Sequence, residues 1–119
     1  RMRFLGEQRE EDLCGLYSNC VASLYPSRYE GFGLPVLEAM QCGAAVVTSK
    51  IPVLEEVGGE AARYASPNEP REWARYMRLI LVDNDFRQAS RDASLRRAQQ
   101  FAWRKTAQRL RQLYEQCLA

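Results

Sequence analysis

The first half of the chain alternates short apolar runs with segments of helical periodicity. Four apolar runs predict β-strands, one of them at Met2–Leu5 before Gly6 and the others at residues 21–25, 44–48 and 61–65. Apolar residues recur at helical spacing between these runs, which predicts helices over residues 9–19, 35–43 and 52–57. Strands that alternate with helices are typical of a parallel, doubly wound, Rossmann-like α/β sheet.

The second half of the chain is predicted to be mostly helical. Pro70 favours a helix start, and three breakers at residues 83–85 are expected to end that helix and to cap the next one at 86–100. The apolar face of the helix that begins at Pro70 comprises Trp73, Met77, Ile80 and Leu81. The apolar face of the last predicted helix comprises Ala107, Leu110, Tyr114 and Cys117 or Leu118. We expect Trp73 and Trp103 to be core residues rather than sugar platforms.

Length and composition predict one ordinary globular domain. The chain has 119 residues, of which 46% are hydrophobic and 27% charged. It has no His, and none of its four cysteines has C-x-x-C spacing. This argues against the usual zinc sites and against His-based triads, so we expect no metal. We expect a cytoplasmic protein with reduced thiols, in which Cys42 acts as a small buried hydrophobe.

The charge is distributed unevenly. Residues 1–60 carry 5 basic and 9 acidic side chains, whereas residues 61–119 carry 12 basic and 6 acidic ones. The range from Arg87 to Arg111 contains eight basic residues and a single acidic one, Asp92. The simpler interpretation is a solvated helix face. The alternative is attraction to an anionic membrane surface, which would place the protein at the periphery of the inner membrane face, with no nucleic acid involved.

The segment between the second predicted strand and the helix at 35–43 has the chemistry of an anion and sugar site. A loop that follows a strand and opens a helix lies at the edge of the sheet where ligands bind. Gly31 and Gly33 permit close approach of the backbone, and the N–H groups of Gly33 and Leu34 suit a phosphate. Glu30 and Glu38 flank them, and a carboxylate accepts hydrogen bonds from vicinal sugar hydroxyls. The alternatives are a solvated loop acid and a carboxylate favoured in the first turns of a helix.

The residues from Pro26 to Met40, P-S-x-x-E-G-F-G-L-P-x-L-E-A-M, resemble the signature of family-four glycosyltransferases of the GT-B fold. Seven residues separate the two glutamates, as in that signature. The resemblance extends from Phe4 to about Tyr114. Its further matches are Phe4-Leu5-Gly6, Gly43, Val46-Val47, the segment from Leu54 to Gly59, and Phe101-Ala102-Trp103.

The resemblance implies a role for each residue of the motif. It assigns Glu30 as the catalytic group beside the donor sugar and Glu38 as the acceptor of ribose hydrogen bonds. It assigns the backbone of Gly31, Phe32, Gly33 and Leu34 to the sugar hydroxyls and the diphosphate. The implied activity is retaining, metal-free transfer of a hexosyl group from a UDP-, GDP- or ADP-sugar to a glycan or lipid-linked acceptor. The alternative is a non-catalytic nucleotide-binding or interaction module that retains the motif.

The resemblance also implies missing parts. It covers only the latter two-thirds of a donor-binding domain, so residues 1–119 form a single incomplete nucleotide-sugar-binding domain. The N-terminal acceptor domain and two strand–helix units with their phosphate-neutralising cations are absent, and we expect the chain alone to be inactive. The strand at Met2–Leu5 would have lost its neighbours. It would pair beside residues 21–25, exchange between two chains in a swapped homodimer, or belong to a longer protein.

Overall fold

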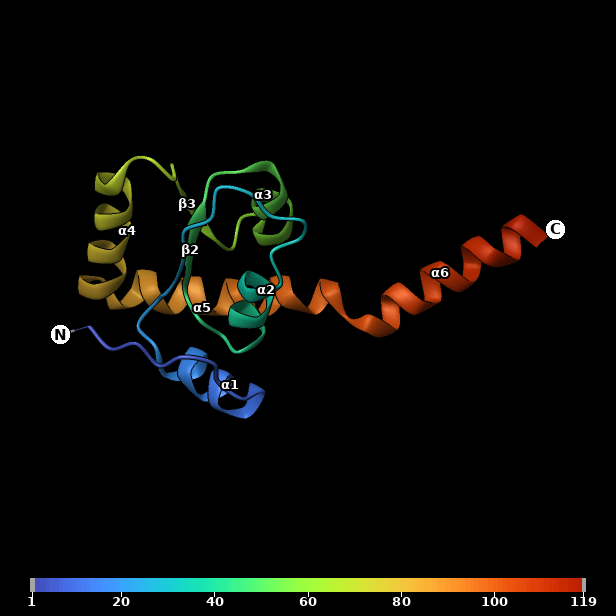
Figure 1. Ribbon diagram of the computed structural model, residues 1–119, viewed down its shortest axis with the longest axis horizontal. Coiled ribbons are helices and arrows are strands. Elements are labelled where there is room, and N and C mark those ends of the chain that lie inside the picture. The colour runs from blue at the N-terminus through green and yellow to red at the C-terminus, as the bar shows by residue number, and fades with distance from the viewer. Residues whose placement is uncertain (1, 119) are drawn as a thin grey trace.

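The computed structural model describes residues 2–118 and shows a parallel three-stranded sheet with flanking helices (Figure 1). The strand order is β1-β2-β3, with Leu24 opposite Val47 and Thr48 opposite Tyr64. The strands are β1 (Ser23–Tyr25), β2 (Val46–Ser49) and β3 (Arg63–Ala65). The helices are α1 (Glu10–Asn19), α2 (Leu34–Gln41), α3 (Pro52–Gly58), α4 (Pro70–Val82), α5 (Asn84–Ala98) and α6 (Trp103–Leu118), with a 3-10 turn at Gln99–Phe101. The predicted α/β class and these six helices are confirmed.

The central strand β2 is buried on both faces. Val46 packs in a cluster with side chains of α2 and α3, whereas Val47 packs with Ile80 of α4 in a second cluster. All four residues of β2 are buried, and so are Ala44 and Ala45 before it. Burial on both faces explains why residues 44–47 form a continuous apolar run rather than an alternating one. Trp73 joins the second cluster, as predicted, and its indole N–H donates to the Ser66 carbonyl at 2.9 Å.

Helix α5 holds the C-terminal ends of three other helices in place. It runs from the end of α4 past α1 and α2 (Figure 1). Three of its arginines donate to carbonyl groups at or just beyond the ends of other helices, which have no acceptor role inside those helices. Arg87 donates to the carbonyls of Ile80 (2.8 Å) and Leu81 (3.2 Å), Arg91 to those of Ser18 (2.8 Å) and Cys20 (3.3 Å), and Arg97 to those of Val57 (3.0 Å) and Glu56. Cations are stabilising at helix C-termini because of the helix dipole.

These contacts change the interpretation of the basic stretch. Arg87, Arg91 and Arg97 donate hydrogen bonds to backbone carbonyls of other helices. They therefore do not belong to a freely solvated face or a free anion-binding surface. Lys105 donates to the Gln99 carbonyl at 3.0 Å, and Arg111 forms an ion pair with Glu115 at 2.8 Å. The predicted cap between α4 and α5 is confirmed, because the Asp83 carboxylate accepts from the Phe86 N–H at 2.9 Å.

The strand predicted at Met2–Leu5 is wrong. The segment forms no strand, Phe4 is 92% exposed, and Gly6 turns the chain with a φ of 67° before α1. It therefore does not pair beside β1. A strand needs a neighbour that satisfies its backbone groups and covers its side chains, and the described residues provide none at this position.

The prediction that Trp103 is a core residue is also wrong. Its side chain is 81% exposed, because α6 leaves the body of the molecule as soon as it begins (Figure 1). No residue of α6 is buried, and the projecting helix gives the molecule extents of 58 × 30 × 30 Å. No helix within residues 2–118 is both long and apolar enough to cross a membrane.

Candidate functional site

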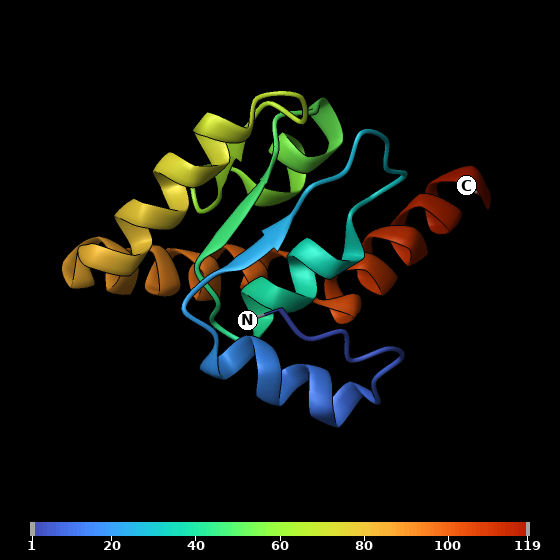
Figure 2. The ribbon, with the colours of Figure 1, turned by 60° about the vertical axis from the view of Figure 1, so that its left-hand side comes forward.

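The loop of residues 26–33 leaves β1 at its carboxyl end and returns into α2 (Figure 2). Two buried hydroxyl residues at the end of β2 anchor it. Thr48 Oγ1 donates to the Tyr25 carbonyl at 3.1 Å, and the Ser27 N–H donates to Ser49 Oγ at 2.8 Å. Because β2 is the central strand, the loop is attached to the most rigid part of the sheet.

Glu30 is fixed by two hydroxyl groups. Tyr25 Oη donates to Glu30 Oε1 at 2.6 Å, and Ser27 Oγ donates to the same oxygen at 2.8 Å. No described residue donates to the second oxygen, Oε2. The hydrogen bonds from Tyr25 and then Ser27 lower the pKa of Glu30, so the group is a carboxylate at neutral pH. One oxygen is thus held in place, and the other is available to a ligand.

The pKa of Tyr25 is affected by both glutamates of the motif, although its hydrogen bond is to Glu30 and not to Glu38. The hydrogen bond to Glu30 raises the pKa of Tyr25 to about 12, with smaller contributions from burial and from the charges of Glu30, Tyr17 and Glu38. Burial and the charge of Glu38 also raise the pKa of Tyr17. The phenol of Tyr25 therefore stays protonated at neutral pH and remains a hydrogen-bond donor to Glu30.

Gly33 forms the junction between the loop and α2. Its φ of 91° lies in the left-handed region, and an added Cβ would lie 2.4 Å from Leu54 Cδ2. Helix α2 starts at Leu34, and the N–H groups of Val36 and Leu37 both donate to the Gly33 carbonyl. Within residues 2–118 no acceptor takes the N–H groups of Gly33 or Leu34. The N-terminus of α2 thus has unused donors and a positive dipole end.

The other motif residues that the resemblance assigns to the donor lie on the surface, whereas Val36, Leu37, Ala39 and Met40 are buried in the core. Gly31 is exposed, Leu34 is 51% exposed, and Glu38 is exposed on α2 one turn after the junction. Phe32 is 44% exposed, and its ring meets that of Phe101 edge to face at a centroid distance of 6.2 Å. Phe101, which belongs to the downstream segment that also resembles the family, is therefore in contact with the loop.

Four residues of the site were not predicted from the sequence. Tyr25 and Ser27 hold the Glu30 carboxylate, and Thr48 and Ser49 hold the loop backbone. A signal was present, because Thr48 and Ser49 are hydroxyl residues that end an apolar strand at the ligand-binding edge. The pairing of β1 with β2 is what brings these hydroxyl groups to the loop.

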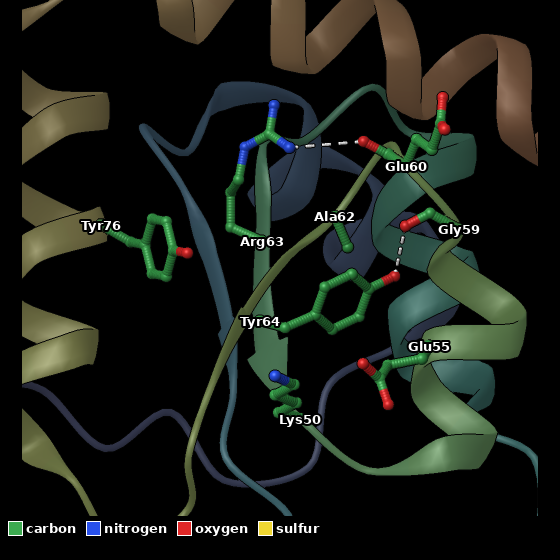
Figure 3. Close-up of a pocket in the computed structure, with 8 residues that line it drawn as sticks. All are labelled: Lys50, Glu55, Gly59, Glu60, Ala62, Arg63, Tyr64 and Tyr76. Carbon is green, nitrogen blue, oxygen red and sulfur yellow. Dashed lines mark hydrogen bonds between the residues drawn. The ribbon is translucent and has the colours of Figure 1, made fainter.

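A separate open cavity of about 470 Å³ lies at the outer edge of β3, between α3 and α4 (Figure 3). Its lining residues are Lys50, Glu55, Gly59, Glu60, Ala62, Arg63, Tyr64 and Tyr76. Tyr64 points toward α3 and donates to the Gly59 carbonyl at 2.6 Å. No motif residue lines it, and its charges are mixed, so the site of the motif loop is the better candidate. Residues 2–118 hold no cluster of three or more side chains suited to a metal ion.

Comparison with protein families agrees with the motif. The model of the family described as glycosyl transferases group 1 matches residues 1–97. O-antigen chain mannosyltransferase B from Escherichia coli is 42% identical over 102 residues, which cover 86% of this chain and 27% of that protein. A D-inositol 3-phosphate glycosyltransferase from Corynebacterium jeikeium is 32% identical over 118 residues, covering 97% of this chain and 28% of that protein.

The fold also matches a solved structure. Sucrose-phosphate synthase from Thermosynechococcus elongatus superposes with a TM-score of 0.89 at 30% sequence identity, covering 99% of this chain and 30% of that one. The chain thus spans less than a third of the length of each of these three proteins.

Proposed function

The chain belongs to the glycosyl transferases group 1 family, and on that basis we propose that it is the donor-binding part of a retaining glycosyltransferase. Its substrate is a nucleoside diphosphate sugar, from which a hexosyl group passes to a glycan or lipid-linked acceptor. The observation that carries the proposal is Glu30, held through one oxygen by Tyr25 and Ser27 beside the open N-terminus of α2.

The donor's anionic part is assigned to the start of α2. The free N–H groups of Gly33 and Leu34 and the helix dipole favour a diphosphate. Glu38 projects from the same helix into solvent and has two oxygens for the ribose hydroxyls. This part of the site binds the nucleotide, and the loop with Glu30 binds the sugar.

Glu30 is assigned to the reacting end of the donor. Breaking the bond between sugar and diphosphate places positive charge on the sugar ring, and a fixed carboxylate stabilises that charge most in the transition state. Tyr25 and Ser27 reduce the reorganisation this requires, because they hold Glu30 before substrate arrives. Glu30 therefore contributes to the rate of transfer more than to donor affinity.

The names of the relatives suggest the sugar to test first. O-antigen chain mannosyltransferase B and the serotype-specific mannosyltransferase WbdA, both from Escherichia coli, are named for mannosyl transfer. We therefore propose a mannosyl donor ahead of a glucosyl one. The base of the nucleotide is left to measurement among UDP, GDP and ADP.

Calorimetric titration with UDP, GDP and ADP, their sugars and the free nucleosides tests the donor site. We expect weak binding of a nucleoside diphosphate in preference to its nucleoside. Glu38→Ala should weaken this binding by about 10- to 100-fold, the typical value of hydrogen bonds to a charged group. Glu56→Ala is the matched control, because Glu56 is an exposed helical carboxylate on α3 and is not among the residues assigned to the donor. Equal affinities of Glu38→Ala and the parent would contradict the ribose assignment.

The catalytic assignment needs a longer protein that carries this segment together with an acceptor-binding part. There, Glu30→Gln should lower kcat far more than it changes nucleotide affinity. NMR of the product sugar reports whether the anomeric configuration is retained. Donor binding with no turnover in the parent would favour the alternative of a non-catalytic nucleotide-binding module.

A further inference from the structure

Two thiols meet where α1 packs against α2. Cys42 Sγ lies 3.4 Å from Cys14 Sγ, and the residues are 28 positions apart in the chain. Both cysteines are free. We propose that Cys14 and Cys42 are a modification site, at which a low-molecular-weight disulfide oxidises the pair to a reversible intramolecular disulfide. This inference rests on the thiol geometry and is independent of the donor site.

The pair differs from the other two cysteines in its surroundings. Cys20 Sγ donates to the Tyr17 carbonyl at 3.2 Å, and Cys117 lies exposed on the projecting helix α6. Within residues 2–118, Cys14 and Cys42 form the one sulfur–sulfur contact. The fold therefore selects this pair among the possible pairings.

The distance is suited to closure. A disulfide has an S–S length of about 2.05 Å, so the two sulfur atoms have to approach by little more than about 1 Å. Helix α1 has no buried residue, and its C-terminal end is attached largely through Arg91 and the partly buried Tyr17. A helix attached in this way can make the small movement that bond formation requires.

The two thiols have different roles in the exchange. Cys14 is exposed and meets the oxidant first, whereas burial, followed by the contact with Cys14, raises the pKa of Cys42 to about 11. The Cys14 thiolate attacks the oxidant RS–SR, forms a mixed disulfide and releases one thiolate. Cys42 then loses its proton to solvent and attacks Cys14 Sγ, which releases the second thiolate. Two protein thiols are oxidised, and one small disulfide is reduced to two thiols.

The bond would fasten α1 to the C-terminal end of α2. The Cys42 N–H donates to the Glu38 carbonyl at 3.1 Å, so Cys42 belongs to the same turn as a motif residue. Closing a loop of this length restricts the unfolded chain, and we expect the melting temperature to rise by roughly 5–15 °C on oxidation.

The test compares the rates at which oxidised glutathione closes two alternative pairs. Cys14 and Cys20 fall in one tryptic peptide, residues 10–28, so each pair is isolated by substitution. Cys20→Ser/Cys117→Ser retains Cys14 and Cys42, whereas Cys14→Ser/Cys117→Ser retains Cys20 and Cys42. We expect the first variant to lose about two mass units under non-reducing conditions at least tenfold faster than the second.

Repetition in guanidinium chloride supplies the control. The unfolded chain should favour the Cys20–Cys42 pair slightly, because that pair closes the shorter loop. A preference for Cys14–Cys42 that disappears on unfolding supports the proposal. Equal rates in the folded chain, or mixed disulfides with glutathione that never close, would overturn it.

Discussion

The two ends of the parallel strands are built in opposite ways. We call them the amino edge, where the strands begin, and the carboxyl edge, where they end. At the amino edge, α5 lies against the C-terminal ends of neighbouring helices, and Arg87, Arg91 and Arg97 donate hydrogen bonds to the terminal carbonyls of those helices. At the carboxyl edge, the N–H groups at the start of α2 and one oxygen of Glu30 have no partner among the described residues. The arginines of α5 thus have backbone partners within the fold, whereas the donors and the carboxylate oxygen of the motif loop are available to a ligand.

This difference separates residues that stabilise the fold from residues that act on a ligand. Arg87, Arg91 and Arg97 at the amino edge already have partners, so their removal should lower the free energy of unfolding. Charges at the carboxyl edge are held in position but incompletely satisfied, so their removal should change binding more than stability. The junction at Gly33 belongs to both groups, because it opens α2 and also packs on the core.

The largest effect is expected at that junction. Gly33→Ala forces a side chain into a left-handed conformation and against Leu54, which is fully buried. We expect a loss of about 2–4 kcal/mol in the free energy of unfolding, measured by urea denaturation. Gly31→Ala is the matched control in the same loop, because no atom lies within 4 Å of its added Cβ and its φ is not positive. Similar losses in the two variants would refute the packing argument.

At the amino edge, two adjacent arginines offer a comparison. Arg97→Gln removes hydrogen bonds to the Val57 and Glu56 carbonyls and should cost about 1–3 kcal/mol of unfolding free energy. Arg96→Gln changes an exposed side chain and should stay within about 0.5 kcal/mol of the parent. A cost for Arg96→Gln as large as that for Arg97→Gln would indicate a general effect of charge rather than helix capping.

At the carboxyl edge, the titration of the Glu30 carboxylate tests its hydrogen bonds. Because Tyr25 and Ser27 lower the pKa of Glu30, the charged form favours folding above the unfolded pKa, and this contribution is lost as the pH falls through the folded value. Tyr25→Phe removes the largest cause, so the pKa of Glu30 should rise toward its ordinary value. NMR titration of the side-chain carboxyl carbon follows this directly. An unchanged Glu30 titration in Tyr25→Phe would show that the hydrogen bond does not hold the carboxylate in solution.

The smallest effect is expected for a hydroxyl on α5. Ser94 is fully buried, and its Oγ has no hydrogen-bond partner within residues 2–118, so Ser94→Ala should be neutral or stabilising by up to about 1 kcal/mol. Thr48 is equally buried, but its hydroxyl holds the Tyr25 carbonyl, so Thr48→Val should cost about 1–2 kcal/mol. Equal responses to the two substitutions in thermal unfolding would remove this distinction.

The sequence was sufficient where periodicity and local chemistry decide the structure. The apolar run before Thr48, Gly33 in the motif loop and Asp83 as a helix cap were all predictable from neighbours in the chain. The predicted class, helices and three of four strands followed. The roles of Glu30 and Glu38 stay predictions, because no ligand contact tests them.

The errors came from interactions that depend on the rest of the fold. Met2–Leu5 has the composition of a strand but no neighbouring strand to pair with, and Trp103 lies on a helix with nothing beside it. Arg97 was counted with the solvated charges, because only the packing of α5 against α3 reveals its carbonyl partners. Exchange of the N-terminal segment between two chains stays a prediction, which light scattering over a concentration series checks.

A map of where the donor binds tests most directly whether the motif loop and the start of α2 form the donor site. Backbone amide spectra recorded during titration with GDP-mannose and with UDP-glucose locate the affected residues. If the donor binds at the motif loop, the shifts concentrate in residues 27–38 and at Tyr25, with little change along α5. Shifts concentrated around Lys50, Tyr64 and Tyr76 at the β3 cavity, or along α5, would contradict this assignment.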